Sequence, residues 1–462
     1  MRSLIVVLLA LLVSPLSTAQ SWQSVLTEGS LDPALHGVWQ SRGYGWVLDA
    51  TSADLTVYDV GAAGCIRNEE ATQAFLYGDG LFSLDSGVLR TALAPQNSTQ
   101  HMFDAISALP SSCDTPPGDS PREVFDYAWS VMNEHYAFFD LHGVDWDARY
   151  NELAPTITDD MSDADLRDAL VALLAGLEDG HLGLAAEIDG QPVGYTGRGP
   201  RAISAAITDA FEAQDEMDSR RDFSIRWNRG NRHRLREEIL GGEFKVDGPL
   251  LWGRIGDVGY LQISGMGGFA GDHDDVAYTD EMQALHEGMS RMLRDLDDTD
   301  GMIIDLVFNR GGYDEVSFAI ASHFATEPTH AVTKYAKTHE ADTRQTFSVL
   351  PCEPFYRQPV VLLTSDVTMS AAEGFVIAMR ALPTVTHAGE TTRGALSNVL
   401  YKPLPNGWML SVSNEVYLDA EDELWERRGI EPEMPLDVFE GGNLKGHTDA
   451  LLELADRLKR DE

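Results

Sequence analysis

The stretch "PVVLLTSDVTMSAAEGFVIAMRAL", residues 359–382, changes character near its middle. Its first six residues form an apolar run typical of a buried strand, and the segment from Ala371 onward is apolar and helix-prone. Ser370 therefore stands where a strand gives way to a helix. Such a serine is most often a helix N-cap. Because the N–H groups and dipole of a helix start also favour a developing oxyanion, Ser370 is equally a candidate nucleophile.

The same succession of strand and helix extends on both sides of this stretch. Apolar strand patterns occur at LLWGRI, VGYLQIS, GMIIDLVF, PTVTHAGE and WMLSVSNEVYL, and the helical patterns DEMQALHEGMSRMLRDL and VSFAIASHFA lie among them. This order predicts an α/β layer fold with a mixed, mostly parallel sheet over residues 249–440. A closing amphipathic helix is expected over residues 441–462.

Three further segments precede this core. Residues 20–115 alternate apolar and polar positions between Gly, Asp and Ser turns, which predicts a small β-rich domain. Residues 120–185 carry apolar residues at helical spacing and predict a helical subdomain. Residues 186–248 are polar with some helical content, and we interpret them as a cap or variable insertion.

The first residues are typical of an export signal. Arg2 is followed by the apolar run LIVVLLALLV, and Ser17-Thr18-Ala19 offers small residues for cleavage. The run is too short to span a bilayer, and no later segment approaches about 18 uninterrupted apolar residues. We therefore expect residues 1–19 to be a signal peptide and the mature protein to be soluble, periplasmic or extracellular. No cysteine follows the cleavage site, so no lipid anchor is expected.

The charge of the chain limits its partners. It has 34 basic and 74 acidic residues, a formal net charge of −40. A chain this acidic repels nucleic acid and anionic membrane surfaces, so neither is an expected partner.

The cysteines and histidines suggest neither a disulfide-rich nor a metal-binding protein. Export permits disulfides, and Cys65 with Cys113 would close a loop within the β-rich region, which leaves Cys352 as a buried thiol. The sequence suggests no fixed histidine neighbour for any cysteine, so a cysteine nucleophile is not expected. The 13 histidines are scattered without an HExxH or CxxC spacing, and we expect no metal.

Several other short motifs could support a nucleophilic serine, although each is weak alone. The turn NRGG, residues 309–312, follows a strand and could present bare N–H groups, or be only a tight turn that needs φ > 0. His181 follows a helical stretch that Gly180 would end, and a histidine in a turn is usually structural. Glu426 stands beside a tryptophan and could be a surface charge. Ser370 lacks the G-x-S-x-G pattern, which disfavours an α/β-hydrolase elbow.

Taken in order, these motifs resemble peptidase family S41, which comprises the carboxyl-terminal processing proteases, the tricorn protease core and the repeats of the photoreceptor retinoid-binding protein. The resemblance covers about residues 120–438, and VMNEHYAFFDLHGVDWDARY is similar to the helical entry of the tricorn-like branch. The set is specific in its order, although no single motif is. It consists of EDGHLGL (178–184), DLVFNRGG (305–312), TSDVTMSAAE (364–373), GETTRG (389–394) and WERRGIEPE (425–433).

The departures from the family pattern indicate the branch. The processing proteases pair their serine with a lysine about 25 residues downstream, where this chain has Ala395, which cannot act as a base. The tricorn-like branch takes its base from a D-[GS]-H-[ST] motif, which Asp179-Gly180-His181 matches and Leu182 does not. No carboxylate-binding loop of PDZ type is evident between His181 and Leu250.

The resemblance implies a serine peptidase that forms an acyl-enzyme without a cofactor. Ser370 would be the nucleophile, His181 its base and Glu426 the acid that orients the histidine, directly or through a hydroxyl. The oxyanion would be held by the N–H of Ala371 and one from Gly311 or Gly312.

Two rival functions remain open on the same fold. Relatives of the retinoid-binding type bind hydrophobic ligands without evident proteolysis, and an esterase would use the same groups. A complete Ser–His–Glu set favours an enzyme, with a peptide or an unfolded protein as substrate. If His181 were not the base, His387 would be the next candidate.

Overall fold

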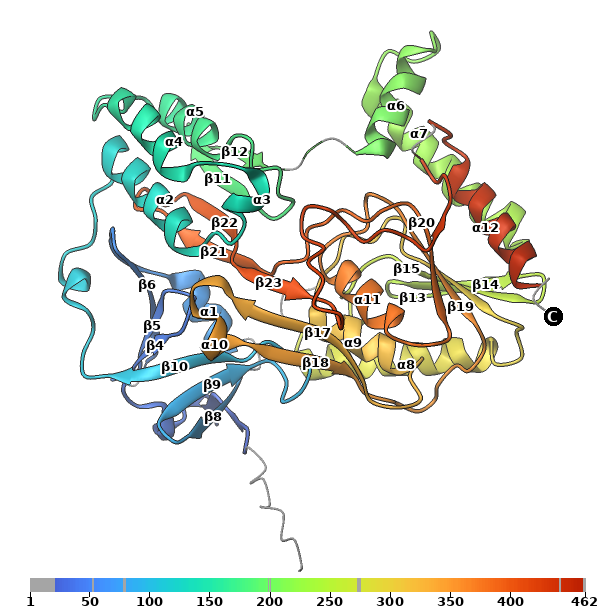
Figure 1. Cartoon of the computed structure of the whole chain (residues 1–462), viewed down its shortest axis with the longest axis horizontal. Coiled ribbons are helices and arrows are strands. Elements are labelled where there is room, and N and C mark those ends of the chain that lie inside the picture. The colour runs from blue at the N-terminus through green and yellow to red at the C-terminus, as the bar shows by residue number, and fades with distance from the viewer. Residues whose placement is uncertain are drawn as a thin grey trace, which may run out of the picture.

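The computed structural model describes residues 21–51, 54–77, 80–197, 199, 201–271, 276–439 and 442–459. The predicted signal peptide lies outside these residues. None of the described helices is both long and apolar enough to cross a membrane. Figure 1 shows the N-terminal strands and the first helices on one side of the molecule and the large α/β layer on the other.

The N-terminal region is β-rich, as predicted, and forms an eight-stranded antiparallel sheet in the order β1-β8-β9-β10-β4-β5-β6-β7. Helix α1 (Glu69–Tyr77) packs Phe75 against apolar side chains of this sheet. The predicted disulfide between Cys65 and Cys113 is confirmed. The strands are β1 (Gln23–Ser24), β4 (Val38–Ser41), β5 (Trp46–Asp49), β6 (Thr56–Gly61), β7 (Gly64–Arg67), β8 (Leu81–Asp85), β9 (Val88–Ala92) and β10 (His101–Ile106), with a separate pair β2 (Leu26–Thr27) and β3 (Ser30–Leu31).

The helical region covers a second, four-stranded sheet in the order β12-β11-β22-β21 (Figure 1). Ser120 and Ser162 cap the two longest helices of this region, and acidic residues in their first turns complement the helix dipoles. The elements are α2 (Pro121–His135), α3 (Phe139–His142), α4 (Trp146–Leu153), α5 (Asp163–Leu174), β11 (Gly183–Ile188), β12 (Gln191–Thr196), β21 (Val399–Pro403) and β22 (Met409–Ser413).

The core is a seven-stranded mixed sheet in the order β13-β14-β15-β16-β19-β20-β24, parallel from β15 onward, which confirms the predicted fold class. The strands are β13 (Phe244–Asp247), β14 (Leu250–Ile255), β15 (Val258–Ile263), β16 (Met302–Asp305), β19 (Val360–Thr364), β20 (Val385–Gly389) and β24 (Met434–Pro435). A three-stranded antiparallel sheet adjoins it, made of β17 (Thr329–Ala336), β18 (Gln345–Val349) and β23 (Glu415–Leu418), with the short helix α10 (Glu340–Thr343) after β17.

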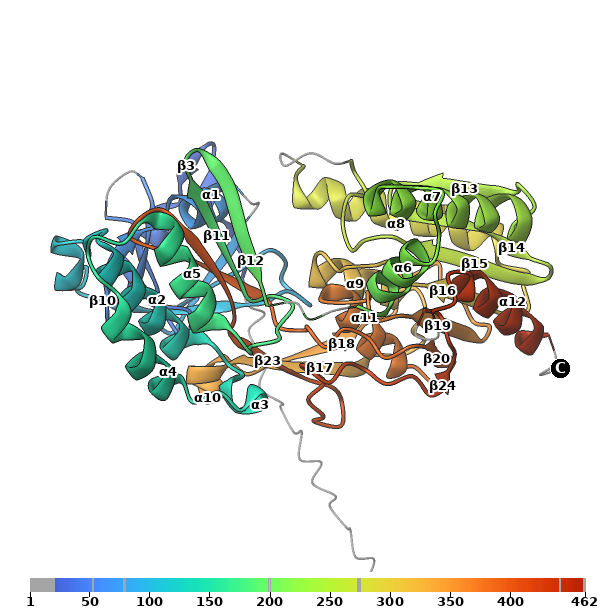
Figure 2. The same cartoon turned by 90° about the horizontal axis from the view of Figure 1, so that it is seen from above.

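Helices cover both faces of the core sheet because its strands are apolar on both sides. Ile304 and Leu362 face the helices α8 (Tyr278–Asp295), α9 (Asp314–Ser322) and α11 (Ala371–Arg380). Ile303 and Leu363 face the other layer, in which α6 (Ala202–Glu212) packs on α7 (Arg220–His233) and α7 lies beside α12 (Gly446–Leu458), as Figure 1 shows. Figure 2, seen from above, has the N-terminal strands at the left and these helices at the right. Successive side chains of each strand point to opposite faces of the sheet, so one strand contributes to two separate hydrophobic layers.

The order of the strands determines which loops meet. Strands β16 and β19 are parallel neighbours, so the loops after their carboxyl ends emerge at the same edge of the sheet. The first of these loops contains the NRGG turn, and the second ends at Ser370. Side chains at such an edge are well placed to form a functional site.

Candidate active site

Ser370 has a backbone conformation that an ordinary helix N-cap does not have. Its dihedrals are φ 60° and ψ −133°, whereas an N-cap residue normally lies in the β region. A non-glycine residue at positive φ is strained, and such strain is concentrated at functional sites. The turn from β19 into α11 thus presents Ser370 on a strained elbow, although the G-x-S-x-G sequence is absent.

Glu373 holds this elbow in place from inside the fold. Its Oε2 accepts hydrogen bonds from the N–H of Ser370 at 3.1 Å and of Ala395 at 2.9 Å, and its Oε1 accepts from Thr392 Oγ1 and the N–H of Gly394, both at 2.6 Å. Burial raises the pKa of the Glu373 carboxyl, and these hydrogen bonds oppose that rise. The sequence analysis did not assign Glu373. Its signal was the S-x-x-E spacing of a capping box, which Ser370 and Glu373 form.

The two glycines of the NRGG turn lie directly against the elbow. A Cβ on Gly311 would lie 2.6 Å from Ser370 Cβ, and its φ of +96° also favours glycine. The N–H of Gly311 already donates to Asn309 Oδ1 at 2.9 Å. Within the part of the chain that the structure describes, the N–H groups of Gly312 and Ala371 have no acceptor. These two are therefore the available donors beside Ser370.

The loop that carries His181 reaches the same place from the other sheet. Helix α5 ends earlier than predicted, at Leu174, and Gly176 with φ +80° follows it, so the prediction that Gly180 ends the helix was wrong. Gly180 is needed for close packing instead. A Cβ there would lie 2.8 Å from Ala395 Cβ and 3.2 Å from Cε of Met369, the residue before Ser370.

This packing also bears on the alternative lysine base. Because Ala395 Cβ faces Gly180, a longer side chain at position 395 would run into the loop that carries His181. The loop is fixed by Asp179, whose Oδ1 accepts the N–H of His181 at 2.8 Å. A lysine at position 395 would therefore require this loop to move.

Glu426 lies in a buried acidic group next to this loop. Its Oε2 accepts the N–H groups of Leu396 and Ser397, both at 3.0 Å. Burial raises the pKa of Glu426 well above its usual value, and the nearby charge of Asp179 raises it further. Tyr136 is fully buried, and burial followed by the charges of Asp179 and Glu426 raises the pKa of its phenol. Nothing in the sequence around Tyr136 indicated that its hydroxyl would join this group.

His387, the alternative base, has a structural role. It is fully buried in β20, with Nε2 2.8 Å from Thr364 Oγ1 and Nδ1 3.3 Å from Arg380 Nη1. Burial, with a smaller effect of the Arg380 charge, lowers the pKa of His387 to about 3. It is held by core partners, and its ring is uncharged at neutral pH.

A cavity of about 410 Å³ adjoins the elbow, between the N-terminal sheet and the core. Gly312 forms part of its wall, one residue from the glycine that touches Ser370. Most of the remaining wall is apolar or aromatic and comes from the N-terminal region, with Trp46, Phe75, His101 and Phe103, and from β21, with Tyr401. The β-rich region thus builds one side of the candidate site.

Comparisons with known proteins assign two regions of the chain. Residues 257–436 match Peptidase family S41, and residues 117–175 match the Tricorn protease C1 domain. The chain belongs to peptidase family S41. Among solved structures, this S41 chain is 25% identical to a Parabacteroides merdae protein provisionally assigned as a peptidase, with a TM-score of 0.54 over 73% of this chain and 97% of that one. Mature CPAF complexed with lactacystin shares the fold, at 12% identity and a TM-score of 0.50 over 74% and 98%.

As an S41 peptidase, the protein is a serine-type hydrolase. The S41 match contains Ser370, Gly312 and Glu426, whereas His181 lies between the two matched regions. The N-terminal sheet precedes both regions, so the match does not account for its wall of the cavity.

Proposed function

We propose that this S41 peptidase is exported and cleaves peptide bonds through an acyl-enzyme formed on Ser370, with His181 as the base. The observation that carries the proposal is the strained backbone of Ser370 packed against Gly311, with available N–H groups on the residues that follow these two, Ala371 and Gly312. Export is supported by the N-terminal sequence and by the Cys65–Cys113 disulfide, which requires an oxidising compartment.

The proposed reaction uses only groups of the chain and water. His181 takes the proton of Ser370 Oγ as this oxygen attacks the peptide carbonyl. The N–H groups of Ala371 and Gly312 bind the oxyanion that develops, and each such donor is worth about 3–4 kcal/mol in the transition state. His181 then protonates the leaving amine, and water, activated by the same imidazole, releases the acyl group. Asp179 positions the His181 loop, and Glu426 positions the segment packed against that loop.

The cavity beside Gly312 indicates the substrate class. Its apolar and aromatic wall would bind a large apolar side chain close to the scissile bond. Because an extended peptide can present a single side chain to such a cavity, we propose peptides or unfolded chains as substrates rather than folded proteins.

Filling this cavity is expected to weaken substrate binding. Ala74 lines the cavity from helix α1, whereas the next residue back, Gln73, is exposed and does not line it. Ala74→Trp should raise KM for apolar peptides about tenfold or more, the effect of losing about 1.4 kcal/mol or more of binding. Gln73→Trp should leave it unchanged. Steady-state kinetics on a peptide series measure this, and equal KM values for both variants would remove the cavity from the substrate site.

The proposed function is tested by labelling with a fluorophosphonate, which reacts with activated serines, followed by peptide mapping. The label is expected on Ser370 and is expected to be lost in Ser370→Ala, together with peptide cleavage. A protein that only binds hydrophobic ligands would neither label nor cleave. Hydrolysis of esters without any cleavage of peptides would assign an esterase instead.

A further inference from the structure

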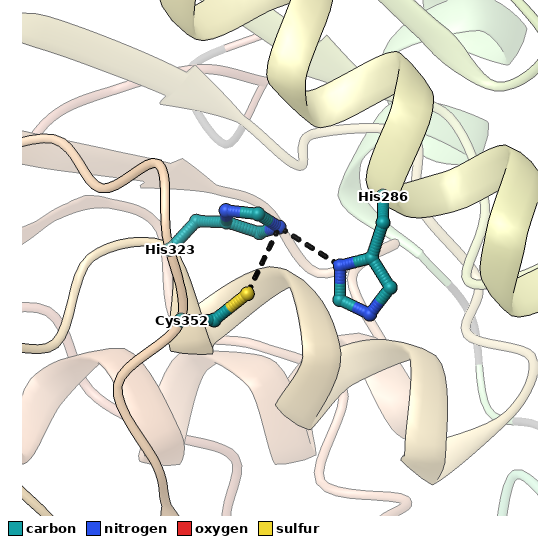
Figure 3. A group of neighbouring side chains, drawn as sticks. All are labelled: His286, His323 and Cys352. Atoms are coloured by element: carbon teal, nitrogen blue, oxygen red, sulfur yellow. Dashed lines mark hydrogen bonds between the residues drawn. The ribbon is translucent and has the colours of Figure 1, made fainter.

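Two histidines and the one free cysteine among the described residues meet on the α8 and α9 side of the core sheet. His286 lies on α8, His323 follows α9 directly, and Cys352 lies in the loop after β18. Figure 3 shows the three side chains pointing toward one another, with His323 between the other two. None of them has a part in the proposed reaction.

The spacing of their donor atoms suits a tetrahedral metal ion. His323 Nε2 lies 3.1 Å from His286 Nδ1 and 4.0 Å from Cys352 Sγ, and the three donor atoms all lie within 4.8 Å of one another. With metal bonds of zinc length, a regular tetrahedron separates two ligand atoms by about 3.3–3.6 Å. Changes of up to about 1.2 Å in these separations would therefore give the three donor atoms tetrahedral spacing.

The tautomer of His323 is also the one a metal requires. His323 Nδ1 lies 2.6 Å from the carbonyl oxygen of Pro354, which can only accept, so Nδ1 carries the proton and Nε2 presents its lone pair. Burial lowers the pKa of both His286 and His323, which favours the neutral form of each ring. His323 is fully buried, while His286 and Cys352 are partly exposed and leave a way in for an ion.

We propose that His286 Nδ1, His323 Nε2 and Cys352 Sγ bind one Zn²⁺ ion, with water as the fourth ligand. Two imidazoles and a thiolate are ligands that zinc prefers, and Ca²⁺ and Mg²⁺ prefer oxygen. On binding, the thiol releases one proton to solvent and a sulfur–zinc bond forms. The proton that His286 Nδ1 donates to His323 moves to His286 Nε2 by exchange with water, and no group is oxidised or reduced. The negative charge of the protein, −40, raises the local concentration of cations. The ion would link α8, the end of α9 and the loop after β18.

The spacing of these three residues in the sequence does not indicate a metal site. The three residues are 37 and 29 positions apart, whereas zinc motifs are recognised by pairs of ligands a few residues apart. The expectation that no histidine neighbours a cysteine was wrong, because His323 reaches Cys352 through the fold. The thiol of Cys352 is also less buried than predicted.

Competition with a chromogenic zinc chelator tests the proposal on the full-length protein. Wild type is expected to hold one Zn²⁺ ion at micromolar or lower free zinc. His286→Gln and Cys352→Ser, both at partly exposed positions, should each weaken binding at least about tenfold, the loss typical of removing even a hydrogen-bond partner of a ligand. The exposed His36→Gln should bind like wild type, and so should His181→Ala, which excludes binding at the candidate catalytic centre.

Cobalt provides a second measurement that reports the sulfur ligand. Co²⁺ should give a thiolate charge-transfer band in wild type that is absent in Cys352→Ser. Zinc should raise the Tm of wild type more than that of either ligand variant. If wild type binds no zinc at micromolar concentration, or if Cys352→Ser and His286→Gln bind it as wild type does, the three side chains form only a hydrogen-bonded contact and the proposal is overturned.

Discussion

His181→Ala is expected to lower kcat on a peptide substrate nearly as far as Ser370→Ala, by about 10⁴-fold or more, and the double variant should be little worse than either single one. The reason is that a nucleophile and its base act as one unit, so that removing either removes the same step. The loop of His181 packs on Met369, which precedes Ser370 in the chain, and on Ala395, whose carbonyl oxygen accepts the N–H of Ser370.

A second histidine supplies the control for this experiment. His142 is half-buried and lies within electrostatic range of Asp179, the residue that fixes the His181 loop. His142→Ala should keep most of the wild-type kcat, and thermal melting should show that all variants are folded. If His181→Ala remained active while His142→Ala did not, the base would be His142 and the proposed assignment would be wrong.

Lys402→Met is expected to destabilise the protein by about 3–5 kcal/mol, the typical cost of leaving a buried charge without its partner. The Lys402 and Asp59 side chains are both 2% exposed and form an ion pair between β21 and β6. Lys402 Nζ also donates to the carbonyl oxygen of Tyr44 at 2.6 Å. Without the lysine, the side-chain hydrogen bond that Asp59 keeps among the described residues is the one from Asn68 at 2.5 Å. The pair joins the N-terminal sheet to the rest of the protein.

Urea unfolding measures this loss, and a matched lysine supplies the control. Lys245 pairs with Asp295 at the surface, with side chains 63% and 33% exposed, and Lys245→Met should have little effect. Adding Asp59→Asn to Lys402→Met should recover part of the stability, because no buried charge is then left unpaired. Equal midpoints for Lys402→Met and Lys245→Met would show that the buried pair does not contribute to stability. Since the N-terminal sheet forms a wall of the cavity, Lys402→Met should also raise KM.

Local patterns were sufficient for the elements of the core. The apolar run of β19, the helical spacing of α11 and the alternation of strands and helices predicted a mixed, mostly parallel sheet, and the structure has one. They were not sufficient for the continuous stretch WMLSVSNEVYL, which the structure divides between two sheets, β22 beside β11 and β23 beside β17. Alternation shows that a segment is extended, but the identity of its partner depends on distant residues, more than 200 positions away for β22 beside β11 and about 80 for β23 beside β17.

The sequence by itself determined the fold class, the family and the turn at which Ser370 stands, because these depend on short-range periodicity and on motifs a few residues long. Only the tertiary structure decided which groups surround that serine. It showed that the N–H of Gly311 donates to Asn309 and that the buried carboxylate of Glu373 accepts the N–H of Ser370. It also placed the wall of the cavity in the N-terminal region and brought His286 and His323 to Cys352. The physical reason is that these contacts join segments brought together by packing of separate layers, and no local periodicity records which layers will meet.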